Sequence, residues 1–285
     1  MTSRVTAGEP AVAVLPNPDA VSAAAADHIA NALRDAVTAR DRADWATTGG
    51  SAPIGIYRRL GSPRLRDSVP WSGVHLWWGD DRYVPPDHPL SNILPADQIL
   101  LAAAAHSGTD WLEDEPDDAL KGIHPGAPIP VENIHPFPTS EAIGETRGPA
   151  WAAAHYDADL RAAGLETHDG WPVFDLVLLG VGPDGHVMSV FPNSTTFDEA
   201  AWALPVPAPT HVEPHVTRLT LNPRILDVAR QVLVVVHGAA KAEIVGTIFG
   251  DKRDPRLWPA QLVRRPGVSW LLDEAAAAGL PRGLR

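Results

Sequence analysis

The sequence predicts an α/β fold, with three αβα layers around a mostly parallel central sheet. Two observations support this prediction: short apolar runs alternate with helix-length amphipathic segments along most of the chain, and the runs are apolar throughout, as expected for strands buried on both faces. In addition, polar segments containing glycine follow several of the runs, where open α/β sheets bind ligands.

The predicted elements follow one another along the chain. A first strand is expected at Ala11–Leu15, and a helix from about Asp19 to Arg40 follows it. One face of that helix is apolar: Val21, Ala25, Ile29, Leu33 and Val37. Further buried strands are expected at Trp45–Thr47, Val74–Trp78, Phe174–Leu179, Val232–Val236 and Val268–Leu272. Further helices are expected to begin near Pro53 and to span Asn92 to about Ala105, Gly148–Ala163 and Ala239–Phe249.

Two segments interrupt this alternation. His106–Pro130 is acidic and rich in Gly and Pro, which predicts an exposed loop insertion. Pro205–Pro214 contains four prolines and is predicted to be a second loop. Because no linker or repeat is evident, residues 1–285 are expected to form a single domain.

Composition excludes several functional classes. The chain has no cysteine, which rules out disulfides, thiolate catalysis and zinc–sulfur sites. A net charge of −12 disfavours nucleic-acid binding. Met1–Pro10 does not resemble a signal peptide, and no apolar run is long enough to span a membrane. We therefore expect a soluble, cytoplasmic protein with no membrane partner.

The first candidate site is a turn between a strand and a helix, at Thr47–Pro53. Gly49 and Gly50 permit a tight turn, and the helix that follows presents free N–H groups at its positive end. Together with the Ser51 hydroxyl, this pattern predicts a phosphate-binding turn. The alternative is an ordinary turn in which Ser51 caps the helix.

The second candidate is Trp77–Val84, followed by Ser91-Asn92. Asp80, Asp81 and Arg82 come directly after a predicted parallel strand, so they are expected at the ligand-binding edge of the sheet. They could supply orienting carboxylates and a cation. The alternative is a surface turn with an ion pair.

The third candidate is the segment Phe174–His186. Its Gly180–Gly185 stretch matches a G-x-G-x-x-G dinucleotide motif, but Pro192 follows too soon for a long crossover helix, which disfavours a nicotinamide site. Asp184 and His186 suit general acid–base catalysis, with a carboxylate beside a histidine. The alternative is a histidine that only caps the turn.

The fourth candidate comprises Arg218 and the Gly238–Lys241 segment, which begins a helix after a strand. Only three of the 23 basic residues are lysines, so Lys241 at this edge is more indicative of a phosphate ligand than of a chance surface lysine. His211 and His215 have a spacing that metal ligands can show, but they lie in the proline-rich segment without a third ligand. We predict no metal and no cofactor.

In this order, the four motifs resemble those of the glucosamine-6-phosphate isomerase/6-phosphogluconolactonase family. The resemblance extends from about Ala11 to Leu272. Three departures stand out against the family pattern: Thr48 and Ala52 in the glycine turn, Asp81 in place of a glutamate, and Val187-Met188 after the histidine. Ala52 removes one hydroxyl from the phosphate-binding turn.

The resemblance implies a Rossmann-like fold similar to that of glucosamine-6-phosphate deaminases. It also implies hydrolysis of 6-phospho-D-glucono-1,5-lactone, the second step of the oxidative pentose phosphate pathway. His186 would be the acid–base residue, with Asp184 or Asp80 orienting it, and Arg82 would stabilise negative charge. The residues that would bind the phosphate are Gly49, Gly50, Ser51, Arg218 and Lys241.

Two alternatives remain. The first is an aldose–ketose isomerase or deaminase acting on an amino-sugar phosphate, with Asp80 as the carboxylate base. The second is a non-catalytic sugar-phosphate sensor that has kept the pocket. In each case the expected partner is a small sugar phosphate, and the oligomeric state is left open between a monomer and a weak dimer.

Overall fold

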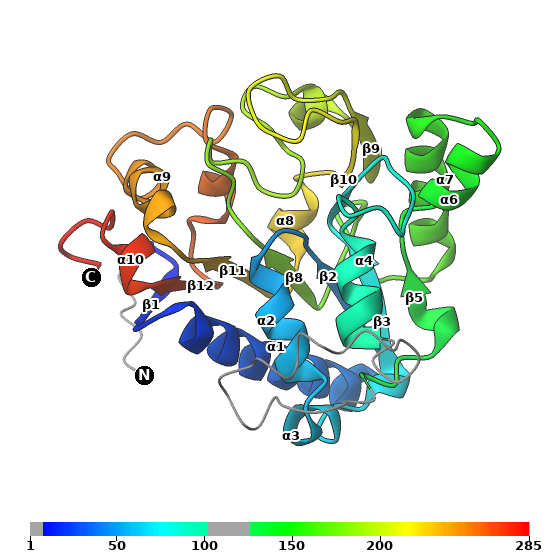
Figure 1. The fold of residues 1–285 in the computed structure, drawn as a ribbon, viewed down its shortest axis with the longest axis horizontal. Helices are drawn as coiled ribbons and strands as arrows, with labels where there is room; N and C mark the ends of the chain where they lie inside the picture. Colours follow the sequence, from blue (N-terminus) through cyan, green and yellow to red (C-terminus); the bar gives the residue numbers. More distant parts are fainter. Residues whose placement is uncertain (1–7, 102–125, 285) are drawn as a thin grey trace.

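A computed structural model describes residues 8–101 and 126–284 of the chain. Its centre is a seven-stranded sheet in the order β1-β12-β11-β8-β2-β3-β5, which Figure 1 shows extending from β1 at the left to β5 at the right. Every neighbouring pair in this sheet is parallel. The strands are β1 Ala11–Leu15, β2 Ala43–Thr47, β3 Val74–Trp78, β5 Ile134–His135, β8 Leu176–Leu179, β11 Val232–Val236 and β12 Val268–Asp273.

Helices surround the sheet. They are α1 Pro18–Arg40, α2 Ala52–Leu60, α3 Pro63–Arg66, α4 Ile93–Pro95, α6 Thr139–Gly144, α7 Pro149–Ala162, α8 Ile225–Val228, α9 Ala242–Ile248 and α10 Glu274–Ala277. Short 3₁₀ segments occur at Trp71–Gly73, Val131–Asn133, Thr195–Asp198, Ala239–Lys241 and Pro259–Val263, and a π-helical turn at Ala96–Leu101.

Helices cover both faces of the sheet, as predicted. Trp45 of β2 and Trp77 of β3 occupy positions one residue apart in register, so their side chains point to opposite faces. The Trp45 ring packs edge-on against Tyr57 of α2, whereas the Trp77 ring packs against Tyr156 of α7. All four side chains are fully buried. The predicted three-layer arrangement is therefore confirmed.

Helix α1 shows how local sequence begins one of these layers. The Asn17 side chain accepts a hydrogen bond from the Ala20 amide at 2.8 Å, and Pro18 occupies the first turn. The predicted apolar face is buried at Val21, Ala25, Ile29 and Leu33. This face lies against the strands of the sheet.

A small antiparallel sheet, which the sequence did not predict, extends from the end of β3. It consists of β4 Asp80–Arg82, β10 Arg218–Leu221 and β9 Ala203–Val206, in the order β4-β10-β9. The predicted loop Pro205–Pro214 is therefore wrong at its start, because Pro205 pairs with Leu219 within β9. β9 is an edge strand, where a proline costs no ladder hydrogen bond if its nitrogen faces outward.

Three of the predicted strands, at Ala11–Leu15, Val74–Trp78 and Val232–Val236, have the predicted bounds. Helix formation after Asn92 is also seen, but it is split between α4 and the π-helical turn, and its predicted end lies outside the described residues. Most of the predicted insertion, residues 106–125, also lies outside them. The described remainder is not wholly exposed: Ala127 and Ile129 are buried, and the Ala127 amide donates to the Leu100 carbonyl at 2.6 Å.

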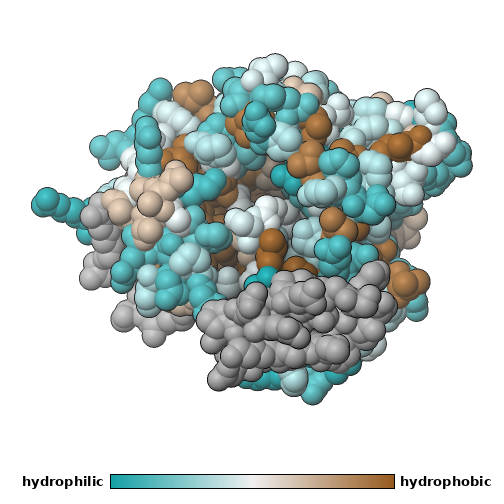
Figure 2. Space-filling view, in the orientation of Figure 1, coloured by the Kyte–Doolittle hydropathy of each residue, from teal (hydrophilic) through white to brown (hydrophobic). Residues whose placement is uncertain are grey.

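Few large hydrophobic side chains are exposed on the described surface. Val14 and Val131 are the large hydrophobic residues exposed in residues 8–101 and 126–284. Figure 2 shows hydrophobic residues in scattered groups on the face that it displays, among many hydrophilic ones. Over the same part of the chain, no helix is both long and apolar enough to cross a membrane.

Candidate active site

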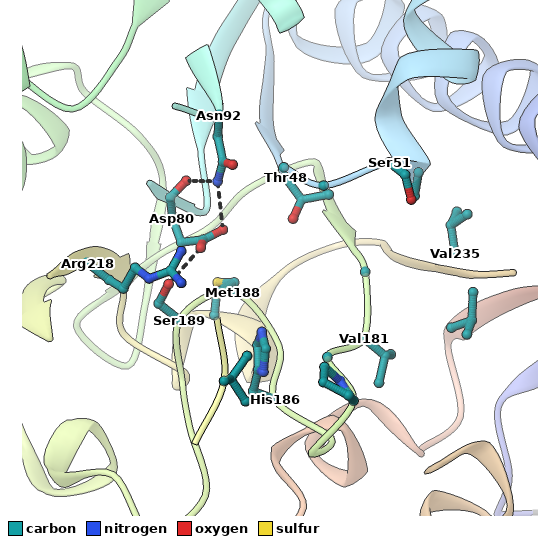
Figure 3. Close-up of a pocket in the computed structure, with 18 of the residues that line it drawn as sticks. Thr48, Ser51, Asp80, Asn92, Val181, His186, Met188, Ser189, Arg218 and Val235 are labelled. Carbon is teal, nitrogen blue, oxygen red and sulfur yellow. Dashed lines mark hydrogen bonds between the residues drawn. The ribbon is translucent and has the colours of Figure 1, made fainter. Parts of the chain in front are cut away.

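A pocket opens at the carboxyl ends of the central strands. It is lined by the segments that follow β2, β3, β8 and β11, together with β10. Eight of the predicted site residues line it: Gly49, Gly50, Ser51, Asp80, Arg82, His186, Arg218 and Lys241. In Figure 3, Asp80, Ser189 and Arg218 lie at the left of the pocket, Thr48 and Ser51 toward the upper right, and His186 below them. The four sequence motifs therefore meet at one edge of the sheet.

The turn after β2 forms one wall of the pocket. Gly50 has a φ of +85°, which favours glycine, and a Cβ atom on Gly49 would lie 1.7 Å from the Asn92 amide oxygen. Both glycines are thus required by local geometry. The Ser51 side chain makes no capping hydrogen bond to helix α2, so the helix-capping alternative is wrong. Ser51 is instead exposed beside the pocket.

Asn92, which follows the second motif, ties Arg82 to Asp80. Arg82 Nη1 donates to Asn92 Oδ1 at 2.6 Å and to the Leu90 carbonyl at 2.9 Å. Asn92 Nδ2 donates to the Asp80 carbonyl at 2.9 Å, and Asp80 Oδ2 accepts from Ser189 Oγ at 2.7 Å (Figure 3). This network fixes the Arg82 side chain at the pocket wall.

Asp81 lies behind this network, fully buried. Its carboxylate accepts from the backbone amides of Arg82 and Asn92, each at 2.7 Å, and from Ser91 Oγ at 3.1 Å. Burial raises the pKa of Asp81 to about 7, even though these hydrogen bonds act to lower it. Asp81 does not line the pocket. Its position is that of a support for the loop that carries Arg82 and Asn92.

Arg82 and Arg218 are direct neighbours across the small sheet. Arg218 Nη2 donates to the Pro214 carbonyl at 2.8 Å, and the buried Nε atoms of both arginines have no hydrogen-bond partner among the described residues. Burial, and then the charge of Arg82, lowers the pKa of Arg218 to about 10, so the Arg218 guanidinium stays charged near neutral pH. In the part of the chain that the structure describes, neither arginine forms an ion pair with a carboxylate. Asp80 and Asp81 attract Arg218 electrostatically but form no salt bridge with it in the described residues, and two adjacent cations of this kind suit an anionic ligand.

His186 lies at the turn after β8, with Asp184 beside it. His186 Nδ1 is 2.5 Å from Asp184 Oδ1, and the ring packs against Phe191 with 4.8 Å between ring centroids. A Cβ atom on Gly182 would lie 2.0 Å from Nδ1, so glycine at this position makes room for the imidazole. Of the two carboxylates considered for orienting His186, the structure pairs Asp184 with it, whereas Asp80 is bonded to Ser189 and Asn92.

The Asp184 carboxylate is shared by two histidines. Burial acts to raise the pKa of Asp184, but the hydrogen bonds from His186 and His211 outweigh it, so this pKa lies well below its usual range. Asp184 is therefore ionised at every pH near neutrality. An ionised carboxylate at Nδ1 leaves Nε2 of a neutral His186 without a proton, which is the form that can act as a base.

Lys241 closes another side of the pocket. Gly238, with a φ of +93°, begins the 3₁₀ turn, and Lys241 Nζ donates to the Val181 carbonyl at 2.6 Å. Burial lowers the pKa of this amine, and the charge of Asp184 partly offsets that effect. Lys241 forms no ion pair with a carboxylate among residues 8–101 and 126–284.

The two histidines of the proline-rich segment do not converge. His211 Nε2 lies 2.8 Å from Asp184 Oδ2, whereas His215 Nδ1 lies 2.7 Å from the Pro209 carbonyl. Within the described ranges, no three His, Cys, Asp or Glu side chains are grouped so that they could hold a metal ion.

Several residues of the site escaped the sequence analysis. Asn92 follows the second motif and Ser189 lies three residues after the third, but the roles of both depend on contacts with distant residues. Phe191, Val212 and Glu213 also line the pocket, and no local pattern distinguishes them. The glycines of the G-x-G-x-x-G stretch do not begin a dinucleotide-binding helix, because no helix directly follows β8. Instead, Gly182 leaves space for the His186 imidazole.

Comparison with known proteins identifies the family. The family model described as glucosamine-6-phosphate isomerases/6-phosphogluconolactonase matches residues 16–271. The chain belongs to this family. It is 33% identical to a 6-phosphogluconolactonase from Nostoc sp., with 94% of this chain and 98% of that protein covered. It is 34% identical to one from Mycobacterium leprae, with 90% and 93% covered.

Solved structures agree with the observed fold. A 6-phosphogluconolactonase from Trypanosoma brucei superposes with a TM-score of 0.76 at 28% identity, covering 96% of this chain and all of that one. A monomeric glucosamine-6-phosphate deaminase superposes with a TM-score of 0.69 at 16% identity, covering 96% of this chain and 99% of that one, which shows a shared fold. The predicted relation to the deaminase fold is therefore confirmed.

Proposed function

We propose that this protein hydrolyses 6-phospho-D-glucono-1,5-lactone to 6-phospho-D-gluconate. The observation that carries the proposal is the pairing of His186 with Asp184 in a pocket that also holds two adjacent guanidinium groups, neither of which forms a salt bridge within residues 8–101 and 126–284. Family membership and the 6-phosphogluconolactonases among the relatives support it. The proposed reaction needs an acid–base residue and cations in one pocket, and its expected partner is the small sugar-phosphate lactone alone.

The proposed reaction begins with His186 as a general base. Its Nε2 removes a proton from a water molecule while the water oxygen attacks the lactone carbonyl carbon. Asp184 holds the ring through Nδ1 and stabilises the imidazolium that forms. The carbonyl oxygen becomes an oxyanion, and Arg82 stabilises its charge, an effect worth roughly 3 kcal/mol for comparable donors.

The second half of the reaction opens the ring. The tetrahedral intermediate collapses, the bond between the carbonyl carbon and the ring oxygen breaks, and His186 returns its proton to that oxygen. The product is a free carboxylic acid, which ionises at neutral pH. Water is the only co-reactant, and His186 ends the cycle in its starting state.

The phosphate group of the substrate is assigned to the turn after β2. The backbone of Gly49, Gly50 and Ser51 begins helix α2, whose amino end favours an anion. Lys241 and Arg218 lie on the pocket wall and supply positive charge to this group. Ala52 contributes no hydroxyl, so backbone amides and these cations carry the binding.

The test is the rate of 6-phosphoglucono-δ-lactone hydrolysis above the spontaneous background, with and without a chelator. We expect a large, chelator-insensitive acceleration that His186→Ala reduces by about 10²-fold or more. His168→Ala is a matched control, because His168 is exposed on the β6–β7 ribbon (Thr167–His168 and Trp171–Pro172). No acceleration by the folded protein would refute the proposal, and ammonia release from glucosamine 6-phosphate would point to the deaminase reaction. We place the reaction in the cytoplasm, which cell fractionation can check.

A further inference from the structure

The second oxygen of the Asp184 carboxylate is occupied by a histidine that the proposed reaction does not use. His211 Nε2 lies 2.8 Å from Asp184 Oδ2, while His186 Nδ1 holds the other oxygen at 2.5 Å. Phe191 packs against both imidazoles, with centroid separations of 4.8 Å to His186 and 5.8 Å to His211. The three side chains around Asp184 therefore form one continuous cluster.

His211 belongs to a loop that borders the pocket. The next residues, Val212 and Glu213, line the pocket, and the Pro214 carbonyl accepts a hydrogen bond from Arg218. His211 attaches one end of this stretch to Asp184, and Pro214 attaches the other to Arg218. The loop is thus attached at one end to the carboxylate that holds the proposed base and at the other end to a cation of the anion site.

We propose that His211 is a positioning residue for the hydrolysis: through Asp184 it holds the pocket-lining loop in place and tempers the basicity of His186. This inference rests on the proposed function. His211 does not line the pocket, so it acts through another residue and is not catalytic.

The sign of the electrostatic effect does not depend on the charge of His211. A neutral His211 donates a hydrogen bond to Asp184 and draws electron density from the carboxylate, which weakens its support for a protonated His186. A protonated His211 adds a positive charge near His186 and disfavours a second one. In both cases, removing His211 makes His186 easier to protonate.

Other titratable groups lie near this cluster and remain unchanged in the His211 variants. Lys241 interacts electrostatically with Asp184, and His237 lines the same pocket. On the loop itself, Glu213 faces the pocket and lies 3.8 Å from His215 Nε2. None of these contacts the second oxygen of Asp184, so substitution of His211 isolates its contribution.

The experiment compares pH profiles of kcat/KM, with kcat and KM measured separately, for the wild type, His211→Ala and His211→Gln. For His211→Ala we expect the acid limb to move up by about half a pH unit, and kcat/KM on the plateau to fall about 3- to 10-fold. Glutamine keeps an N–H donor, so His211→Gln should lie between the wild type and alanine in both respects. His215→Ala is the control on the same loop, and its acid limb should match that of the wild type.

The outcomes separate this inference from the proposed function. If the wild type shows no lactonase activity, the proposed function fails before His211 is tested. If the wild type is active and His211→Ala moves the acid limb by less than about 0.1 unit, His211 does not act through Asp184 and the inference is overturned. A lower melting temperature with an unchanged acid limb would also overturn it, because a purely structural role predicts that pattern.

Discussion

Basic side chains at the two ends of the central sheet have different kinds of partner. At the amino ends of the strands, arginines are matched with carboxylates: Arg42 pairs with Asp44, and both Arg40 and Arg230 pair with Asp175. At the carboxyl ends, the hydrogen bonds that three basic residues of the pocket donate within the described part of the chain all go to carbonyl or amide oxygens. These residues are Arg82, Arg218 and Lys241.

Because of this difference, we expect the arginines at the amino end to contribute to stability and the cations at the carboxyl end to contribute to ligand binding. A paired arginine at the amino end gains its stabilising partner on folding, and nothing remains for a ligand to neutralise. An unpaired buried cation costs desolvation free energy, which a bound anion offsets. The comparison therefore predicts that substitutions at the carboxyl end mainly change activity, whereas substitutions at the amino end mainly change stability.

The largest effect is expected at Arg82. Arg82→Ala removes the group assigned to the oxyanion, so kcat should fall about 10²-fold in steady-state lactonase assays. Arg230→Ala is the matched control at the other end of the sheet, where kcat should be unchanged while the melting temperature drops. Equal losses of kcat in both variants would show that the two ends of the sheet do not differ in their contribution to activity.

A smaller effect is expected at Lys241. Lys241→Ala removes a charged hydrogen-bond donor assigned to the phosphate, so kcat/KM should fall about 10- to 100-fold, mainly through KM. The exposed Lys252, which lies above the Trp258 ring, offers a lysine control in Lys252→Ala. An unchanged KM for Lys241→Ala would remove this residue from the proposed phosphate site.

The amino end is tested through Asp175. Its carboxylate is buried, and it accepts hydrogen bonds from the Asp44 amide at 2.9 Å and from Arg40, with Arg230 Nε at 3.1 Å. Asp175→Asn should lower the free energy of unfolding by about 1–3 kcal/mol, because it removes the charge that both arginines bind. The loss stays in this range because both arginines are partly exposed and solvent screens their attraction. Urea unfolding measures this loss, and kcat should stay at the wild-type value. A loss of activity without a loss of stability would contradict the comparison.

The smallest effect concerns the pH dependence of stability. His75 Nδ1 and His135 Nε2 lie 3.0 Å apart, and His135 stacks on Trp77. Burial, and then the charge of His75, lowers the pKa of His135 to about 4, from an ordinary value near 6.5. The unfolded chain therefore binds this proton more readily, so the contribution of His135 to stability should be constant above pH 6.5 and be lost as the pH drops from 6.5 toward 4. Asp81, whose pKa is raised, contributes with the opposite sign, so the His135 contribution is measured as a difference between wild type and variant.

Melting temperatures between pH 8 and pH 4 check this expectation. His135→Phe keeps an aromatic ring on Trp77 and removes the titrating group, so its melting temperature should decline less over the same range. A variant whose decline matches that of the wild type would show that other groups cause it.

The sequence was informative about the central sheet for a physical reason. Parallel strands buried on both faces must be short apolar runs, and polar residues after them must lie at one edge, which brought the four motifs together. The small sheet was missed because Asp80–Arg82 is polar and only three residues long, and because Pro205 argues against a strand.

The inner details of the site could not be predicted, because they depend on contacts between distant residues. Asn92 fills the space beside Gly49, 43 positions earlier in the chain, and His211 reaches Asp184 across 27 positions. Neither contact leaves a periodic or local signal. The choice between Asp184 and Asp80 as partner of His186 was likewise decided only by the folded geometry.

We propose that Arg82, Arg218 and Lys241, which form no salt bridge within the described residues, select a phosphorylated lactone. The most direct measurement is the ratio of kcat/KM for 6-phosphoglucono-δ-lactone to that for unphosphorylated glucono-δ-lactone, in the wild type and in Lys241→Ala. We predict a wild-type preference of at least about 10²-fold for the phosphorylated substrate, reduced about tenfold or more by the substitution. Equal turnover of both lactones by the wild type, or a preference that Lys241→Ala leaves intact, would show that these cations do not select the phosphate.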